Sequence, residues 1–176
     1  MGFETEPNLA ALAAGRPEAF AALFDQLGPG LLRFARTYLW READAEDVVQ
    51  DLFMVLFRDR KRFERVVDLN AYTFAVLRNL SRQRLAQRAS ELRRLEMARA
   101  HASAKCGGDG DDQADFDALH ASLAKLPVEQ REIIALKIDG DLTFAQIAQV
   151  LAISANTAAS RYRYAVGKLR AELKSE

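Results

Sequence analysis

Residues 153–170, ISANTAASRYRYAVGKLR, contain four basic side chains, two tyrosines and no acid. Hydroxyl, amide and arginine groups at the start of a helix can hydrogen-bond to base edges in the major groove, and cations behind them can contact phosphates. The chemistry open to this segment is therefore recognition of DNA. The side chains that we expect to contact DNA are Ser154, Asn156, Thr157, Ser160, Arg161, Arg163, Tyr164 and Lys168.

The element that must position these side chains is a helix-turn-helix. Apolar residues recur at steps of four, three and four and predict one buried stripe: Ala158, Tyr162, Ala165 and Leu169. Ser154 is a good N-cap for this helix, and Thr143 is a good N-cap for a preceding helix over LTFAQIAQVL. In a helix-turn-helix the second helix enters the major groove, so the tail of the chain is predicted to bind DNA.

A second group of cations lies in the middle of a chain whose net charge is zero. Residues 58–105 hold thirteen basic and five acidic side chains, whereas residues 1–57 hold four basic and nine acidic ones. We expect a helix from Asp68 or Asn70 to about Ser90, with these residues inward: Tyr72, Ala75, Val76, Leu80 and Leu85. Its outer side would then carry Arg78, Asn79, Arg82, Gln83 and Arg84.

An acidic helix precedes the basic one. Val48, Leu52 and Leu56 follow helical spacing in DAEDVVQDLFMVLF, and Asp44 at its entrance suits the positive end of the helix dipole. A partner for the opposite face would need basic residues and an apolar spot. The side chains that we expect to bind it are Asp44, Glu46, Asp47, Gln50, Asp51 and Met54.

The fold expected is all-α, because sustained apolar–polar alternation is missing and helical spacing recurs throughout. GPG at residues 28–30 is expected to end a helix that begins at Pro17. The segment KCGGDGDDQAD holds three glycines and four aspartates and predicts a flexible linker. We therefore expect two small helical domains, at residues 8–95 and 117–174, joined by a flexible linker at 96–116, with short helices over FDALHASLAKL and after Pro127.

Several classes of function are disfavoured. The chain has one cysteine, Cys106, and two histidines, too few for a zinc site or a disulfide. It shows no phosphate-binding glycine loop and no hydrolase or metalloprotease motif, so we expect no enzyme, no metal and no cofactor. No stretch approaches the roughly 20 apolar residues of a membrane span, and the N-terminus is unlike a signal peptide. A cytoplasmic protein without membrane insertion is expected.

Three segments together resemble the extracytoplasmic-function (ECF) sigma factors of bacterial RNA polymerase. DAEDVVQDLFMVLF resembles the helix with which that family binds the polymerase, and LNAYTFAVLRNLSRQRL resembles its promoter-melting helix. The segment from LAKLPVEQREIIALKIDGD to the end of the basic helix resembles its promoter-reading domain. This sequence departs from the family at Tyr72, Gln83 and Ala152, where Trp, Asp and Gly are common.

The resemblance implies a transcription initiation factor. Core RNA polymerase would bind the acidic helix, the C-terminal helix-turn-helix would read the −35 element, and the N-terminal domain would melt and read the −10 element. The residues implied at the −10 element are Phe63, Tyr72, Arg78, Asn79, Arg82, Gln83 and Arg84. Phe63 and the basic RDRKRFER segment would hold an unstacked base, and Phe74 would either stack on bases or pack in the core.

Other interpretations remain open from the residues alone. A helix-turn-helix transcriptional regulator that binds DNA without polymerase would explain the tail, but such regulators usually dimerise. A module that sequesters another protein and does not bind DNA is a third interpretation. The family resemblance implies a monomer when free and adds an anti-sigma factor as a further partner. The acidic linker could also mimic nucleic acid inside a basic channel of the polymerase.

Overall fold

The structure is a computed structural model that describes residues 8–39, 41–101 and 126–173. Every regular element within these ranges is helical. The N-terminal domain contains α1 (Leu9–Ala13), α2 (Pro17–Arg36), α3 (Glu42–Arg58), the short 3₁₀ helix η1 (Arg60–Arg65) and α4 (Leu69–His101). The C-terminal domain contains α6 (Val128–Ile138), α7 (Phe144–Leu151) and α8 (Ala155–Leu173). The all-α prediction is confirmed.

The expected helix break at GPG is wrong, because α2 continues from Pro17 through Pro29 to Arg36. A proline inside a helix removes one hydrogen bond and costs about 3 kcal/mol. Leu27 and Leu31, which flank the GPG segment, are both buried, and this burial offsets the cost. Pro29 itself faces solvent. Tertiary packing therefore overrides the local signal at this site.

The core of the N-terminal domain forms between α2, α3 and α4. Its largest buried side chains are Phe34, Tyr38, Leu52, Phe63, Phe74 and Leu77. The rings of Phe34 and Phe74 meet edge to face, with centroids 5.5 Å apart. Of the two roles expected for Phe74, the structure shows the packing role.

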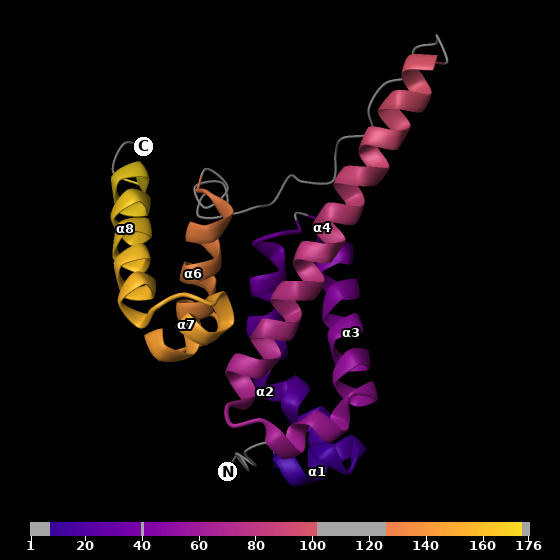
Figure 1. Cartoon of the computed structure of the whole chain (residues 1–176), viewed down its shortest axis with the longest axis vertical. Helices are drawn as coiled ribbons and strands as arrows, with labels where there is room; N and C mark the ends of the chain where they lie inside the picture. Colours follow the sequence, from indigo (N-terminus) through magenta and orange to yellow (C-terminus); the bar gives the residue numbers. More distant parts are fainter. Residues whose placement is uncertain (1–7, 40, 102–125, 174–176) are drawn as a thin grey trace.

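Helix α4 differs from expectation in its length and in its buried face. It begins after Asp68, whose Oδ1 accepts a hydrogen bond from the backbone N–H of Ala71 at 2.9 Å. It ends at His101 and not near Ser90, so it continues into the segment predicted as linker from residue 96. Its C-terminal half extends beyond the other helices (Figure 1). The fully buried face carries Ala71, Phe74, Leu77 and Ser81, whereas Leu85 is exposed. The linker segment 102–116 and the helix predicted over FDALHASLAKL up to residue 125 lie outside the described residues.

The C-terminal domain packs its three helices around a small apolar core. The predicted stripe on α8 is confirmed at Ala158, Ala165 and Leu169, which are buried, and Tyr162 is half-buried. On α6 the buried positions include Ile133, Ile134 and Leu136, whereas Ile138 at its end is exposed. Glu132 and Arg131 are buried although both are charged.

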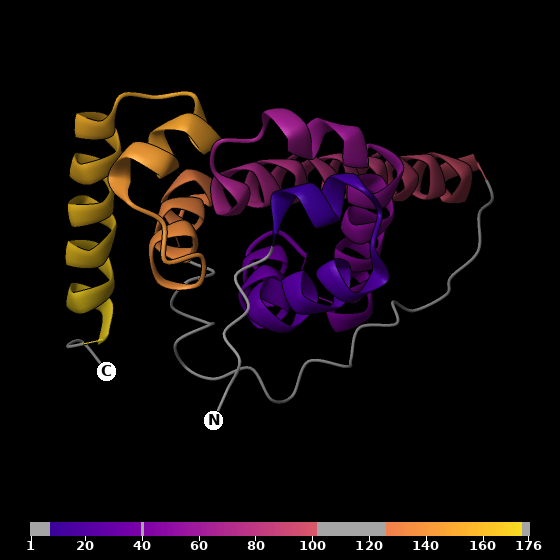
Figure 2. The same ribbon diagram turned by 90° about the horizontal axis from the view of Figure 1, so that it is seen from below.

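The two domains lie side by side. Helices α6 and α7 lie next to the first half of α4 in both views (Figures 1 and 2), and they contact α2 and α4. Helix α8 lies on the far side of the C-terminal domain (Figure 2). No helix among the described residues is both long and apolar enough to span a bilayer.

Candidate nucleic-acid interface

The helix-turn-helix is formed by α7 and α8 and is held by local caps. Thr143 and Gln146 form a reciprocal capping box at the start of α7. Ala152 ends α7 in the left-handed conformation, with a φ of 54°. Ser154 Oγ accepts a hydrogen bond from the backbone N–H of Thr157 at 3.0 Å and so caps α8. These caps position α8 at a defined angle to α7.

The exposed surface of α8 carries most of the side chains predicted to contact DNA. Those that are exposed are Ser154, Asn156, Ser160, Arg161, Arg163, Tyr164 and Lys168, and Thr157 is half-buried. Among the described residues, neither Arg163 nor Lys168 is paired with an acid. Ser154 and Thr157 share a hydrogen bond between their hydroxyls at 2.7 Å, so both have a structural role at the helix start. Exposed arginine and lysine side chains without acidic partners suit phosphate contact.

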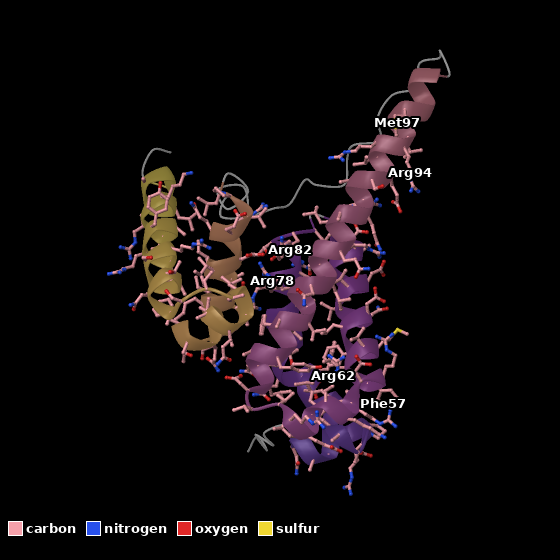
Figure 3. The ribbon with its side chains drawn as sticks, in the orientation of Figure 1. Phe57, Arg62, Arg78, Arg82, Arg94 and Met97 are labelled. Atoms are coloured by element: carbon pink, nitrogen blue, oxygen red, sulfur yellow. The ribbon has the colours of Figure 1, made fainter. Side chains whose placement is uncertain are left out.

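A second polar surface lies on α4. Asn79, Arg82 and Gln83 are exposed, as expected for groups that contact nucleic acid. Two predicted contacts have protein partners instead. Arg84 donates to Asp47 at 2.8 Å. Arg78 is paired with Glu132 on α6, and its side chain is only 17% exposed. In Figure 3 Arg78 lies on the side of α4 next to the C-terminal domain.

Phe63 was predicted to hold an unstacked base, and the structure contradicts this. Its side chain is 1% exposed, because η1 turns the ring into the core beneath Tyr72. The two rings meet edge to face, with centroids 5.8 Å apart. Tyr72 itself is half-buried. The buried Phe63 ring cannot stack on a base, whereas the half-buried Tyr72 ring keeps some exposed surface.

A pocket of about 640 Å³ lies beside Tyr72. Arg62 and Arg65 from η1 contribute charge to it, and the first turns of α4 contribute Ala71, Tyr72 and Ala75. Gln149 and Val150 from α7 form a further part of its wall. The pocket thus combines an aromatic ring with two guanidinium groups and the Asp68 carboxylate, and the C-terminal domain also lines it.

The acidic surface on α3 is exposed where the sequence predicted it. Glu46, Asp47, Gln50, Asp51 and Met54 face solvent, and the Met54 side chain is 70% exposed. Asp44 is half-buried and paired with Arg88 of α4 at 2.5 Å. A groove between α3 and α4 is lined by Asp51, Met54 and Arg58 among others. Acids beside an exposed methionine form the mixed surface that a basic and apolar partner needs.

Burial shifts the protonation of the pair that joins the domains. Burial raises the pKa of Glu132 to about 7, although nearby Arg161 opposes this rise. Burial also lowers the pKa of Arg78, and the neighbouring charge of Arg82 acts in the same direction. Both pKa shifts arise because the Glu132 carboxylate and the Arg78 guanidinium lose hydration at this contact. Within the described residues, no group of three or more His, Cys, Asp or Glu side chains could hold a metal ion.

Comparison with known proteins matches each of the two domains to a family model. The family model for sigma-70 region 2 matches residues 23–91, and the model for sigma-70 region 4 matches residues 116–169. RNA polymerase sigma factor CnrH of Cupriavidus metallidurans is 28% identical over 171 residues, which cover 92% of this chain and 87% of that protein. The chain belongs to the sigma-70 family of RNA polymerase sigma factors. This sigma factor is a transcription initiation factor that directs RNA polymerase to promoters, and it is not an enzyme.

Other relatives agree with this assignment. ECF RNA polymerase sigma factor EcfG of Rhodopseudomonas palustris is 28% identical over 145 residues, covering 82% of this chain and 80% of that protein. The solved structure of CnrH in complex with the cytosolic domain of CnrY has a TM-score of 0.70 at 29% identity and covers 96% of both chains. Bartonella quintana RpoE in complex with the anti-sigma factor NepR shares the fold, with a TM-score of 0.70 at 24% identity over 89% of this chain and 98% of that one. The interpretation as a polymerase-independent regulator is not favoured.

The sequence did not reveal the contact between the domains. Glu132 looks like an ordinary surface acid in VEQREIIALKI, and Tyr38 looks like one more aromatic residue beside α2. The one local hint is glycine, since Gly30 and Gly140 are both buried where the domains meet. A buried glycine permits the close approach of another backbone.

Proposed function

We propose that α8 binds the −35 element in the major groove, with its N-terminal turns toward the bases. Asn156, Ser160 and Arg161 would contact base edges, and Arg163, Tyr164 and Lys168 would contact phosphates. Ser154 and Thr157 would act mainly by capping α8, whose free N–H groups favour a phosphate. The observation that carries this proposal is the row of exposed polar and basic side chains that begins directly after the Ser154 cap.

The N-terminal domain is proposed to melt the −10 element and hold one strand. Asn79, Arg82 and Gln83 would follow that strand along α4, and a base would enter the pocket beside Tyr72, near Arg62 and Arg65. Stacking of a base on an aromatic ring contributes about 1–3 kcal/mol. Arg78 and Arg84 would join this surface once released from Glu132 and Asp47.

The acidic face of α3 is proposed as the binding surface for core RNA polymerase. Glu46, Asp47, Gln50 and Asp51 supply charge and polar groups, and Met54 supplies the exposed apolar centre. An apolar side chain within a charged rim is the usual arrangement of a protein interface. Asp44 would contribute less directly, because it is paired with Arg88.

The remaining partners are proposed by analogy with the relatives. Two similar solved structures are complexes, one of CnrH with the cytosolic domain of CnrY and one of RpoE with the anti-sigma factor NepR. We infer an anti-sigma factor for this chain as well. The free protein is proposed to be a monomer that acts in the cytoplasm, with residues 96–116 containing the connection between the domains at 8–95 and 117–174.

Two matched pairs of variants test the residue roles in run-off transcription with purified core polymerase. Arg82→Ala should reduce open-complex formation, whereas Arg94→Ala, on the projecting part of the same helix (Figure 3), should not. Arg163→Ala should weaken binding to all promoter sequences about equally and reduce its salt dependence, whereas Arg170→Ala, two turns further along α8, should have little effect. Equal losses within each pair would contradict these assignments.

A further inference from the structure

Four aromatic rings form a chain through the N-terminal domain that ends at the pocket beside Tyr72. Phe57 of α3 meets Phe20 of α2 with ring centroids 5.4 Å apart. Phe20 meets Phe63 of η1 at 6.1 Å, and Phe63 meets Tyr72 of α4 at 5.8 Å. Each contact is edge to face, with ring planes between 65° and 77° apart. This ring chain joins α2, α3, η1 and α4 to one another.

Phe63 is the fixed part of the ring chain. Its side chain is 1% exposed, and its ring contacts both Phe20 and Tyr72. Side chains in a close-packed core stay in one rotamer on average. Edge-to-face contacts have a preferred geometry, because the positive edge of one ring meets the negative face of the next. The Phe63 ring therefore restricts the orientations open to Tyr72, whose own side chain is only half-buried.

The other end of the ring chain is held by Arg60, the first residue of η1. The Arg60 guanidinium carbon lies 5.2 Å from the centroid of the Phe57 ring, and Nη1 donates to the Phe57 carbonyl oxygen at 3.3 Å. Arg60 also lies against Gly15, where a Cβ would be 2.9 Å from Arg60 Cδ. Groups from α3 and from the connection between α1 and α2 thus hold the start of η1.

These supports fix the two parts of the pocket that lie in the N-terminal domain. Helix α1 packs against η1, and Leu12 of α1 is fully buried. Arg62 and Arg65 of η1 line the pocket together with Tyr72. In Figure 3 Phe57 and Arg62 lie at the same end of the N-terminal domain. The elements that hold the ring chain therefore also hold the guanidinium groups of the pocket.

The orientation of the Tyr72 ring matters for a base that stacks on it. A side chain that is already held in its bound orientation loses little rotational freedom on binding, so more of the interaction energy appears as affinity. A ring that samples several orientations is competent to stack for only part of the time, and the apparent affinity falls by that fraction. Support of the Tyr72 ring should therefore affect DNA binding even where the supporting residue does not contact DNA.

We propose that Phe20 and Phe63 are positioning residues for promoter opening: they hold the Tyr72 ring in the orientation in which an unpaired base of the −10 strand stacks on it. This inference rests on the proposed function of the pocket beside Tyr72 as a base-binding site. Among the described residues, the pocket lining includes Tyr72 but neither Phe20 nor Phe63. Phe63 thus serves the base through Tyr72 and not by direct contact.

One pair of variants on α2 isolates the ring chain. Phe20→Leu removes the ring that contacts Phe63 but retains an apolar side chain. Phe24→Leu is the matched control one turn further along α2, because the Phe24 ring also meets a phenylalanine of α3 edge to face, with its centroid 5.3 Å from that of Phe53. Phe63→Leu removes the ring in direct contact with Tyr72, and Tyr72→Ala removes the proposed stacking partner itself.

Binding is measured by fluorescence anisotropy with polymerase that carries each variant and with promoter DNA whose −10 non-template strand is unpaired. The intact strand is compared with strands that lack one base each, position by position. Tyr72→Ala should weaken binding to the intact strand about five- to hundredfold, because stacking is lost. It should have no effect on the strand that lacks the base bound in the pocket. That strand identifies the pocket base.

Phe20→Leu and Phe63→Leu should weaken binding to the intact strand about three- to tenfold, because the Tyr72 ring is competent for part of the time. Both should have no effect on the strand without the pocket base. Phe24→Leu should bind every strand as the wild type does. A general loss of stability would weaken binding to the intact and the abasic strands alike, so the difference between the strands isolates positioning.

Equal losses on the intact and abasic strands would show that Phe20 and Phe63 only support the fold, and would overturn the proposal. So would wild-type binding by both variants, or a loss in Phe24→Leu equal to that in Phe20→Leu. If Tyr72→Ala alone depends on the pocket base, the base-binding site stands and the positioning role is wrong. If Tyr72→Ala weakens binding to every strand alike, neither the base-binding site nor the positioning role holds.

Discussion

Gln146 donates a hydrogen bond to Asp68, and this bond links the starts of two helices in different domains. The other end of the Gln146 amide, Oε1, accepts from the backbone N–H of Thr143 at 2.6 Å and completes the capping box of α7. The other oxygen of Asp68 accepts from the backbone N–H of Ala71 and caps α4. One side-chain amide thus ties the helix-turn-helix to the helix proposed to hold the −10 strand.

Gln146→Glu should separate these two roles. Glutamate is equally suited to the capping box, so α7 should keep its stability. Its carboxylate cannot donate to Asp68 and would repel it, which should weaken the interdomain contact. We expect a longer distance between the domains by energy transfer, with little change in the thermal unfolding of the C-terminal domain.

The control for this prediction is the double variant Gln146→Glu with Asp68→Asn. Asparagine can still cap α4, and its amide can donate to the new glutamate. The double variant should therefore return to the closed distance. Identical distances in the single and double variants would contradict a role for this bond in domain closure.

Domain closure should depend on pH through Glu132. Burial raises its pKa to about 7 from an ordinary value of 4.5, so the closed state binds a proton more readily than the open one. By linkage, the closed state is most favoured below pH 4.5, loses this advantage as the pH rises from about 4.5 to about 7, and stays at its least favoured above pH 7. The charged and titratable groups around it are Tyr38 after α2, Arg78 on α4 and Arg161 on α8.

Energy transfer between the domains, measured from about pH 5.5 to about pH 8 across the upper part of this window, checks this sign. The wild-type chain should open gradually as the pH rises. Glu132→Gln removes the titrating group but retains a carbonyl oxygen for Arg78 and Tyr38, so it should flatten the profile near its low-pH value. An equal pH dependence in both proteins would assign the effect to another group.

Local signals in the sequence were sufficient for the helix-turn-helix. Thr143 and Ser154 are N-caps in the structure, as predicted, and Ala152 closes the turn between the two helices in the left-handed conformation. Each of these features depends on atoms within about four residues. The apolar stripe of α8 was also predictable, because one face of that helix packs on its own domain.

Contacts distant in the sequence were not predictable in this way. Pro29 fits inside α2 because the buried residues on both sides of it hold the helix. Gly30 cannot carry a side chain there, because the carbonyl oxygen of Asp139, far along the chain, lies where its Cβ would be. Arg78 and Glu132 each look like solvent-facing charges until the fold brings them together. Helix α4 packs against three other helices, α2, α3 and α7. The helical spacing of its apolar residues therefore does not show which side chains point inward.

Ala152→Gly should stabilise the C-terminal domain. Ala152 has a φ of 54°, a conformation that costs a residue with a Cβ about 1 kcal/mol and that glycine adopts freely. We expect the free energy of unfolding to rise by about 1 kcal/mol in urea denaturation. Ala148→Gly, inside α7, should lower it by a similar amount, because glycine is unfavourable within a helix. Changes of the same sign in both variants would show that the turn is not strained.

Ser154→Asp should distinguish capping of α8 from contact with DNA. Aspartate is a good N-cap and its charge suits the helix dipole, so the domain should be at least as stable as the wild type in urea denaturation. If the start of α8 faces the DNA backbone, the added negative charge should reduce promoter binding by polymerase that carries this sigma factor. Ser154→Asn, which caps without adding charge, should bind DNA nearly as well as the wild type. Normal promoter binding by the aspartate variant would place the start of α8 away from the phosphates, because an anion within contact distance of a phosphate cannot be neutral in its effect.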